Sequence, residues 1–319
     1  AFSGCTGLTS IFIPKTITEA GIYGPFSDCT NLQSVEFEQG ITRIPDCLFR
    51  DCRGKIKTVL PDSVTEVGWN AFGESGLISI ELSKNITLLE SMAFYNCTEL
   101  TSIFIPKAIT EAGTSGPFSE CINLQSVEFE QGITRIPDCL FRDCGGKIRT
   151  VLPDSVTEIG WCAFCDSGLT SVTIPDSVTS IERSAFSGCP ELLSVDLPNN
   201  LRELGAYAFY NCTGLTSVFI PKTVVEAGNG SPFIGCTNLK SFEFEQGMKR
   251  IPDCILDGCN AELNIIIPNG VTEIGWLAFR DSGITSVSIP DTVTEIENGV
   301  FGDCVNLTTI KIPDSVTDM

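Results

Sequence analysis

Apolar residues recur along this chain every 21 to 24 positions, and mostly polar residues fill the places between them. One repeating unit spans 174–195 and reads I-P-D-S-V-T-S-I-E-R-S-A-F-S-G-C-P-E-L-L-S-V. Its last segment, L-x-S-V-x-I in consensus, alternates apolar and polar residues. The alternation predicts a β-strand with Val195 and Leu197 pointing inward and Asp196 pointing outward. The proline that follows cannot donate a backbone hydrogen bond, so we expect it to end the strand and turn the chain.

Two shorter segments complete the unit. The V-T-x-I segment supplies two further inward residues, here Val178 and Ile181. The x-x-A-F-x-x-C segment is too short for a free-standing helix, and we expect it to form one helical or 3₁₀ turn. Its alanine allows close approach, and its phenylalanine fills the core. Because no unit can bury its apolar face alone, the units must stack on their neighbours.

Fourteen such strands are expected, each marked by its first Leu or Ile. These markers are Leu8, Leu32, Ile56, Leu77, Leu100, Leu124, Ile148, Leu169, Leu192, Leu215, Leu239, Leu263, Ile284 and Leu307. A period of this length built on Leu, Ile and Val indicates a leucine-rich-repeat solenoid of the α/β class. We expect a curved, right-handed stack of coils. One long parallel β-sheet would line its concave face, and short helical or 3₁₀ turns would line its convex face.

A longer period of 92 residues lies on top of the coils and gives the super-repeats 8–99, 100–191 and 215–306. One extra coil, 192–214, separates the second super-repeat from the third. The segment Gln33–Cys52 recurs unchanged at Gln125–Cys144. No linker or low-complexity tract interrupts the pattern, so we expect a single continuous array over 1–319. Both ends of the chain fall in mid-repeat, as those of a fragment of a longer array would.

The consensus I-P-x-S-V-T-x-I-x-x-x-A-F-x-x-C-x-x-L-x-S-V closely resembles the BspA-type leucine-rich-repeat family, over the whole chain. The resemblance implies the solenoid fold and an extracellular or cell-surface location. It also implies a role in adhesion or in binding host proteins, and it supplies no catalytic residues. Two features depart from the family pattern. The chain shows no signal peptide, and in three of its 21-residue coils the cysteine is replaced by Ser75, Ser167 and Ser282.

Composition narrows the function classes further. The chain has 319 residues, 42% hydrophobic and 19% charged, which is typical of a globular protein. Its formal net charge of -20 argues against binding to nucleic acid or to an anionic membrane, and suits a cationic partner or solubility. Histidine is absent, which removes Ser-His-Asp and Cys-His catalysis and imidazole metal ligands. We therefore expect no enzymatic activity, no cofactor and no metal.

Sixteen cysteines raise the question of disulfide or metal chemistry. Fourteen occupy two recurring positions, eleven at the consensus cysteine and three at Cys47, Cys139 and Cys254. A residue that recurs once per coil forms a column, where we expect a free thiol to act as a small buried hydrophobe. Disulfides between stacked coils stay possible by distance, although parallel Cβ directions make them awkward. The remaining pair, Cys162 and Cys165, has the C-x-x-C spacing of a redox or half-zinc motif, but no second such motif exists, and a structural role is favoured.

A solenoid usually binds its partner through exposed strand positions on the concave sheet. The residue four after each marker is one of these, with the 21-residue coils set aside. The candidate partner-binding residues at this position are Phe12, Glu36, Glu81, Phe104, Glu128, Asp196, Phe219 and Glu243. Further acidic residues, Glu38, Glu130 and Glu245, follow two positions on. Aromatic anchors among acidic residues suit a protein or glycan partner. Alternatively, the phenylalanines only cover the sheet and the glutamates keep it soluble.

The sequence thus favours a non-enzymatic binding or adhesion module. The alternative is a structural repeat protein that assembles end to end through uncapped solenoid ends. A calcium-binding role for the acidic column is a further possibility. The three G-W-x-A-F tryptophans, Trp69, Trp161 and Trp276, are expected either to pack against the shorter neighbouring coil or to be partly exposed.

Overall fold

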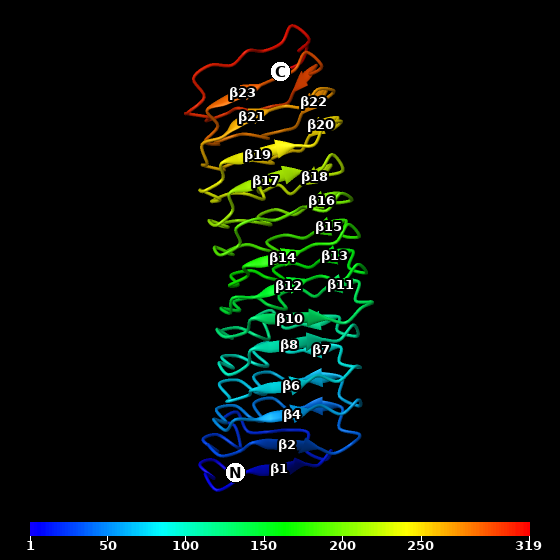
Figure 1. The fold of residues 1–319 in the computed structure, drawn as a ribbon, viewed down its shortest axis with the longest axis vertical. Coiled ribbons are helices and arrows are strands. Elements are labelled where there is room, and N and C mark those ends of the chain that lie inside the picture. The colour runs from blue at the N-terminus through cyan, green and yellow to red at the C-terminus, as the bar shows by residue number, and fades with distance from the viewer. The chain divides into compact units, whose positions relative to one another are not determined.

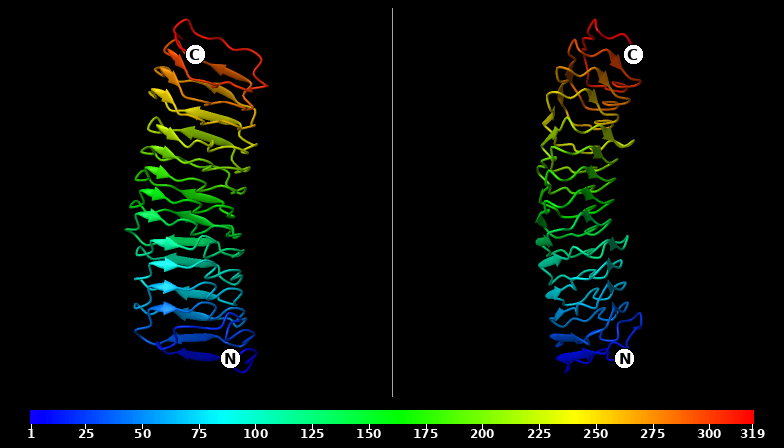
Figure 2. Two further views of the ribbon diagram at one scale, coloured as in Figure 1. Left: turned by 180° about the vertical axis from the view of Figure 1, so that it is seen from behind. Right: turned by 90° about the vertical axis from the view of Figure 1, so that its right-hand side faces the viewer.

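Stacked parallel strands joined by tight turns make up the structure, a computed structural model that describes residues 1–319. The chain forms two compact units, residues 1–156 with 163–169, and residues 157–162 with 170–319. Within each unit successive coils stack on one another (Figures 1 and 2). Most coils contribute one longer strand and one strand of two residues. No helical segment has the length and hydrophobicity that crossing a bilayer requires.

In the first unit the longer strands follow one another in chain order. They are β1 (Ser10–Ile13), β2 (Ser34–Phe37), β4 (Lys57–Val59), β6 (Ser79–Glu81), β8 (Ser102–Ile105), β10 (Ser126–Phe129) and β12 (Arg149–Val151). Hydrogen bonds join β1, β2, β4 and β6 in one ladder and β8, β10 and β12 in another, and β6 packs beside β8. The two-residue strands are β3 (Arg43–Ile44), β5 (Glu66–Val67), β7 (Leu88–Leu89), β9 (Glu111–Ala112) and β11 (Arg135–Ile136). The first four of these form a second parallel ladder.

The second unit repeats this arrangement. Its longer strands are β14 (Ser171–Thr173), β17 (Ser217–Ile220), β19 (Ser241–Phe244), β21 (Asn264–Ile266) and β23 (Ser286–Ser288), with β17 paired to β19 and β21 to β23. Its short strands are β13 (Glu158–Ile159), β15 (Ser180–Ile181), β16 (Glu203–Leu204), β18 (Glu226–Ala227), β20 (Arg250–Ile251), β22 (Glu273–Ile274) and β24 (Glu295–Ile296). They form two ladders, β13 to β18 and β20 to β24. The leucine-rich-repeat solenoid expected from the sequence is therefore present, together with a second set of strands that the sequence pattern did not predict.

Twelve of the fourteen expected longer strands form, so the number of regular turns is smaller than the sequence predicts. The segments that begin at Leu192 and Leu307 have no ladder. In the first of them the predicted alternation of burial is still present, because Val195 and Leu197 are buried while Asp196 is exposed. Inward packing therefore does not depend on a complete hydrogen-bond ladder.

The prediction of a helical or 3₁₀ turn at x-x-A-F-x-x-C is wrong, because the structure contains no helix. In the coil around Phe72 the backbone N–H groups alternate between two kinds of partner. The N–H of Phe72 donates to the carbonyl of Ala93 in the next coil at 2.8 Å, and that of Glu74 donates to Tyr95 at 2.6 Å, while the intervening groups bond three residues back. Asn70 and Glu74 adopt left-handed φ angles of 52° and 57°. Two left-handed residues four positions apart are incompatible with a right-handed helix, so the segment becomes a chain of turns.

The phenylalanine of the same motif forms a spine of stacked rings, which is continuous in the first unit and interrupted once in the second. In the first unit the spine consists of Phe2, Phe26, Phe49, Phe72, Phe94, Phe118, Phe141 and Phe164, with neighbouring ring centroids 5.0 to 5.6 Å apart and interplanar angles of 6° to 19°. In the second unit Phe186, Phe209 and Phe233 stack in the same way, and Phe279 stacks on Phe301. Leu256 takes the place of phenylalanine between these two stacks. The prediction that the phenylalanine of this motif fills the core is confirmed, since ten of these rings, that of Phe72 included, are fully buried.

Candidate binding surface on the long-strand sheet

The registers of the longer strands place the candidate binding residues side by side. Phe12 in β1 pairs with Glu36 in β2, and Phe104 in β8 pairs with Glu128 in β10. The inward neighbours fix this orientation. Val35 and Phe37 are buried on either side of Glu36, so a residue between them must face the solvent.

The structure adds three residues that the sequence reasoning left out. Val59 pairs with Glu81, and Val151 and Ile266 end the corresponding strands β12 and β21. All three are exposed, at 58%, 67% and 70%. They were missed because the 21-residue coils were set aside as irregular. The strand pairing shows that the missing residues of these coils lie outside the strands, so Val59 keeps the same position across the sheet.

Together these positions form what we call the outer row. In the first unit the outer row is Phe12, Glu36, Val59, Glu81, Phe104, Glu128 and Val151. In the second unit it includes Phe219, Glu243, Ile266 and Ser288. The three phenylalanines are 57%, 50% and 47% exposed in chain order. An apolar residue therefore alternates with an acidic residue along the first unit's sheet.

Asp196 is the one candidate residue that lies outside a regular strand. It is exposed, and the carbonyl of Leu193 in its segment accepts a hydrogen bond from the N–H of Thr216 at 3.3 Å, just before β17. This contact places the segment of Asp196 beside the strand that carries Phe219. All eight candidate residues are thus on the solvent side of their coils.

The acidic residues two positions after the row are neutralised by lysines of the preceding coil. Glu38 accepts a hydrogen bond from the backbone N–H of Lys15 at 3.0 Å, and its carboxylate lies 3.2 Å from the Lys15 Nζ. Glu130 with Lys107 and Glu245 with Lys222 repeat the arrangement. These bonds lower the pKa of each of the three carboxyls. The glutamates within the row itself have no such partners, so they carry the free negative charge of this face.

The cysteine columns have a structural role. All sixteen side chains are thiols, and fourteen of them are buried. In six coils the consensus thiol donates to the phenylalanine carbonyl of the preceding coil, as from Cys97 Sγ to Phe72 O at 3.1 Å and from Cys121 Sγ to Phe94 O at 3.1 Å. Cys52 and Cys144 instead donate to the carbonyl of the preceding cysteine at 3.9 Å. Burial raises the pKa of Cys97 to about 12. In the C-x-x-C pair both residues are buried, and the Cys165 thiol donates to the Asp166 carboxylate at 3.2 Å.

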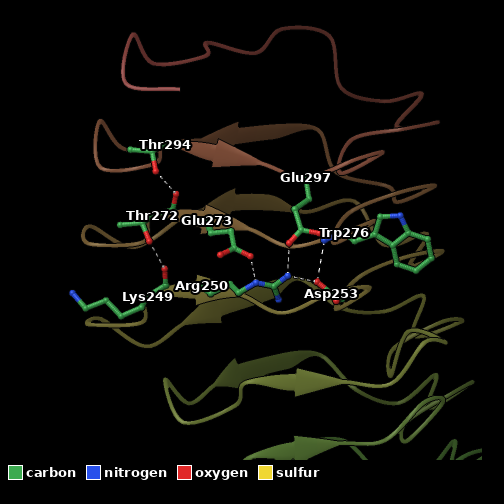
Figure 3. A network of polar contacts seen from close by, with 8 residues as sticks. All are labelled: Lys249, Arg250, Asp253, Thr272, Glu273, Trp276, Thr294 and Glu297. Carbon is green, nitrogen blue, oxygen red and sulfur yellow. Dashed lines mark hydrogen bonds and ion pairs between the residues drawn. The ribbon is translucent and has the colours of Figure 1, made fainter. Parts of the chain in front are cut away.

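A polar network joins the short strands of the second unit (Figure 3). The Arg250 guanidinium contacts Glu273 through Nε, and its Nη2 lies 2.6 Å from Asp253 and 2.5 Å from Glu297. Burial alone would lower the pKa of Arg250, but these three carboxylates outweigh it and raise that pKa, and Arg250 lowers the pKa of Glu273. Asp253 also accepts the backbone N–H of Trp276 at 3.0 Å. The network therefore holds three successive coils together.

The tryptophans are partly exposed. Trp69 and Trp276 are 39% and 42% exposed, while Trp161 is half-buried. Each has its backbone N–H bonded to a carboxylate, of Asp46, Glu182 or Asp253. No group of three or more His, Cys, Asp or Glu side chains is arranged to hold a metal ion.

The fold and its registers define a leucine-rich-repeat solenoid. The model of the BspA-type leucine-rich repeat region matches the chain, in six copies, over residues 1–72, 23–147, 147–262 and 230–319. The chain belongs to the BspA-type leucine-rich-repeat family, as its consensus predicted. No curated protein matches it significantly.

Solved structures of bacterial leucine-rich-repeat proteins are similar to this chain. A leucine-rich repeat protein from Bacteroides ovatus is 27% identical, with a TM-score of 0.75, over 100% of this chain and 85% of that one. A leucine-rich cell surface protein from Faecalibacterium prausnitzii is 26% identical, with a TM-score of 0.40, over 94% and 78%. The pneumococcal vaccine antigen PcpA is 21% identical, with a TM-score of 0.51, over 98% and 78%, and shares the fold.

Proposed function

We propose that this protein is a non-enzymatic binding module that uses the outer row to hold a protein or glycan partner. The observation that carries the proposal is the repeated exposure of phenylalanine at one register position. Phe12, Phe104 and Phe219 are each about half exposed, and each stands beside a glutamate in the next strand. Phe12 and Phe104 belong to the first unit and Phe219 to the second. Large exposed apolar side chains within polar surroundings are typical of interaction sites.

We further propose a location outside the cell or at its surface, which membership of the BspA-type family supports. Burial of the cysteine columns is compatible with an oxidising compartment, because a buried thiol with a raised pKa reacts slowly with oxidants. Detection of the native protein in the culture medium or on intact cells would test this location.

The binding role is tested by comparing three forms of the 319-residue chain on a printed glycan array and a peptide array. The first is the wild type, and the second carries Phe12→Thr, Phe104→Thr and Phe219→Thr. Threonine suits a strand, and Thr173 occupies the same register position in β14. The third is the control Val225→Thr, which removes an exposed apolar side chain (61% exposed) next to the short strand β18.

We expect ligands of the wild type to be lost by the triple variant and kept by the control. Far-UV circular dichroism checks that all three are folded. Sedimentation over a concentration series measures end-to-end self-association, the alternative role. Equal binding by the wild type and the triple variant would reject the outer row as the site.

A further inference from the structure

The apolar members of the outer row in the first unit are evenly spaced. Phe12, Val59, Phe104 and Val151 lie on every second strand of the sheet. Neighbouring strands are about 4.8 Å apart, so the apolar side chains repeat about every 9.6 Å along a line across the strands. The same interval separates Phe219 from Ile266 in the second unit.

This interval matches one extended conformation of a peptide. A polyproline II helix rises about 3.1 Å per residue with three residues per turn, so every third side chain returns to one edge after about 9.3 Å. Over the three intervals between the four anchors, the repeat of this helix and the spacing of the anchors differ by a total of about 1 Å. In a β-strand, side chains on one face repeat every 6.7 Å or so. In an α-helix a side chain returns to the same face after seven residues, or about 10.5 Å, so its repeat and the spacing of the anchors differ by about 3 Å at the fourth anchor.

The charges of the row indicate the rest of the ligand. Glu36, Glu81 and Glu128 lie between the apolar anchors, are exposed and take part in no ion pair. They would attract cations placed between the anchor residues of a bound peptide. Lys57 and Arg149 lie on the same face, two residues before the aliphatic anchors, so a ligand's cations belong over the glutamates and not over Val59 or Val151.

We propose that the outer row of the first unit binds a basic, proline-rich segment of a partner protein, in polyproline II conformation and perpendicular to the strands. The proposal rests on the function proposed above and names the partner class. Such a segment is already extended before it binds, so it loses little conformational entropy, and prolines pack well on aromatic rings. An apolar residue at every third position would contact an anchor, and the lysines or arginines between would face the glutamates.

The test uses a fluorescent 12-residue peptide of four Pro-Pro-Lys repeats, titrated with the full chain and followed by anisotropy. One control peptide has the same composition with irregular spacing, a second has Glu in place of Lys, and a third alternates Val and Lys. We expect the regular basic peptide to bind at least about tenfold more tightly than each control. Phe104→Thr should weaken its binding about tenfold, and Val225→Thr should leave it unchanged. Replacing Glu36, Glu81 and Glu128 by Gln should reduce the dependence of binding on salt.

Absence of binding by the regular basic peptide would overturn the proposal. So would equal binding of the irregular peptide, tighter binding of the Val-Lys peptide, or an affinity insensitive to Phe104→Thr. In each case, if the wild type still bound a glycan or another peptide and the triple phenylalanine variant did not, the proposed binding function would stand. Only the basic, proline-rich partner class would then be rejected.

Discussion

The phenylalanine spine makes a prediction whose size follows from the structure. Phe94 is fully buried, and its ring lies between those of Phe72 at 5.6 Å and Phe118 at 5.0 Å. Phe94→Ala removes the ring and leaves a cavity, which costs about 3–5 kcal/mol. Phe94→Leu keeps most of the apolar volume, as Leu256 does at the same position of its own coil. It loses two stacks of about 0.5–1.5 kcal/mol each, so we expect a cost of about 1–3 kcal/mol.

Hydrogen–deuterium exchange measured by mass spectrometry is the appropriate assay, because a solenoid opens locally and a single unfolding free energy describes it poorly. At tenfold per 1.4 kcal/mol, exchange near residue 94 should quicken roughly 10²- to 10⁴-fold in the alanine variant. In the leucine variant it should quicken roughly 5- to 150-fold.

The effect should be largest in the coils that contact Phe94 and decline with distance along the stack. The exposed Phe104 supplies a control, since Phe104→Thr should change exchange by less than about threefold. The reasoning would be refuted by equal effects of alanine and leucine at position 94. Acceleration spread evenly over the first unit would also refute it, because the coils would then not act through nearest neighbours.

Three further predictions concern the thiols and the charged groups. At pH 8 an alkylating reagent should modify the exposed Cys5 readily and Cys97 only through local opening, since the pKa of Cys97 is about 12; equal rates by mass spectrometry would contradict this. Lys222 lowers the pKa of Glu245 below its ordinary 4.5, so the stability that their pair adds is complete above that pH and is lost in more acidic solution. The melting temperatures of the wild type and Glu245→Gln should therefore differ at pH 7, and the difference should shrink as the pH falls below 4.5; a constant difference would disprove the linkage. Arg250→Gln leaves three carboxylates facing one another and should cost about 1 kcal/mol at neutral pH but less at pH 4, whereas an equal fall in melting temperature at both pH values would argue against a charge effect.

The repeat pattern predicted the inward and outward residues of the coils well. The alternation around Val195 and the burial of the spine phenylalanines depend only on spacing along the chain, which a sequence displays directly. The turn at A-F-x-x-C could not be predicted in the same way. Its N–H groups bond to carbonyls in the next coil, as from Phe72 to Ala93, and this contact between distant residues competes with the local helical bond.

The candidate surface likewise has residues that the sequence spacing predicts and residues that only the strand pairing identifies. Phe104 and Glu128 were found because their coils have regular lengths. Val59 and Val151 were missed because a shorter coil shifts the numbering, and strand pairing alone shows that the sheet position is kept. The bond from the Cys97 thiol to the Phe72 carbonyl likewise joins residues 25 positions apart, and a cysteine column in the sequence indicates burial but gives no acceptor.

The 92-residue period of the super-repeats has a consequence for variants of different length. Deletion or duplication of one super-repeat would remove or add a whole block of four coils. Either product would rejoin one coil to another at an equivalent residue, so spine, ladders and thiol bonds would continue across the junction. Each added block would also bring another Phe–Glu–aliphatic series to the surface, as in Phe104, Glu128 and Val151, so the protein would become longer while this part of its surface kept the same chemistry.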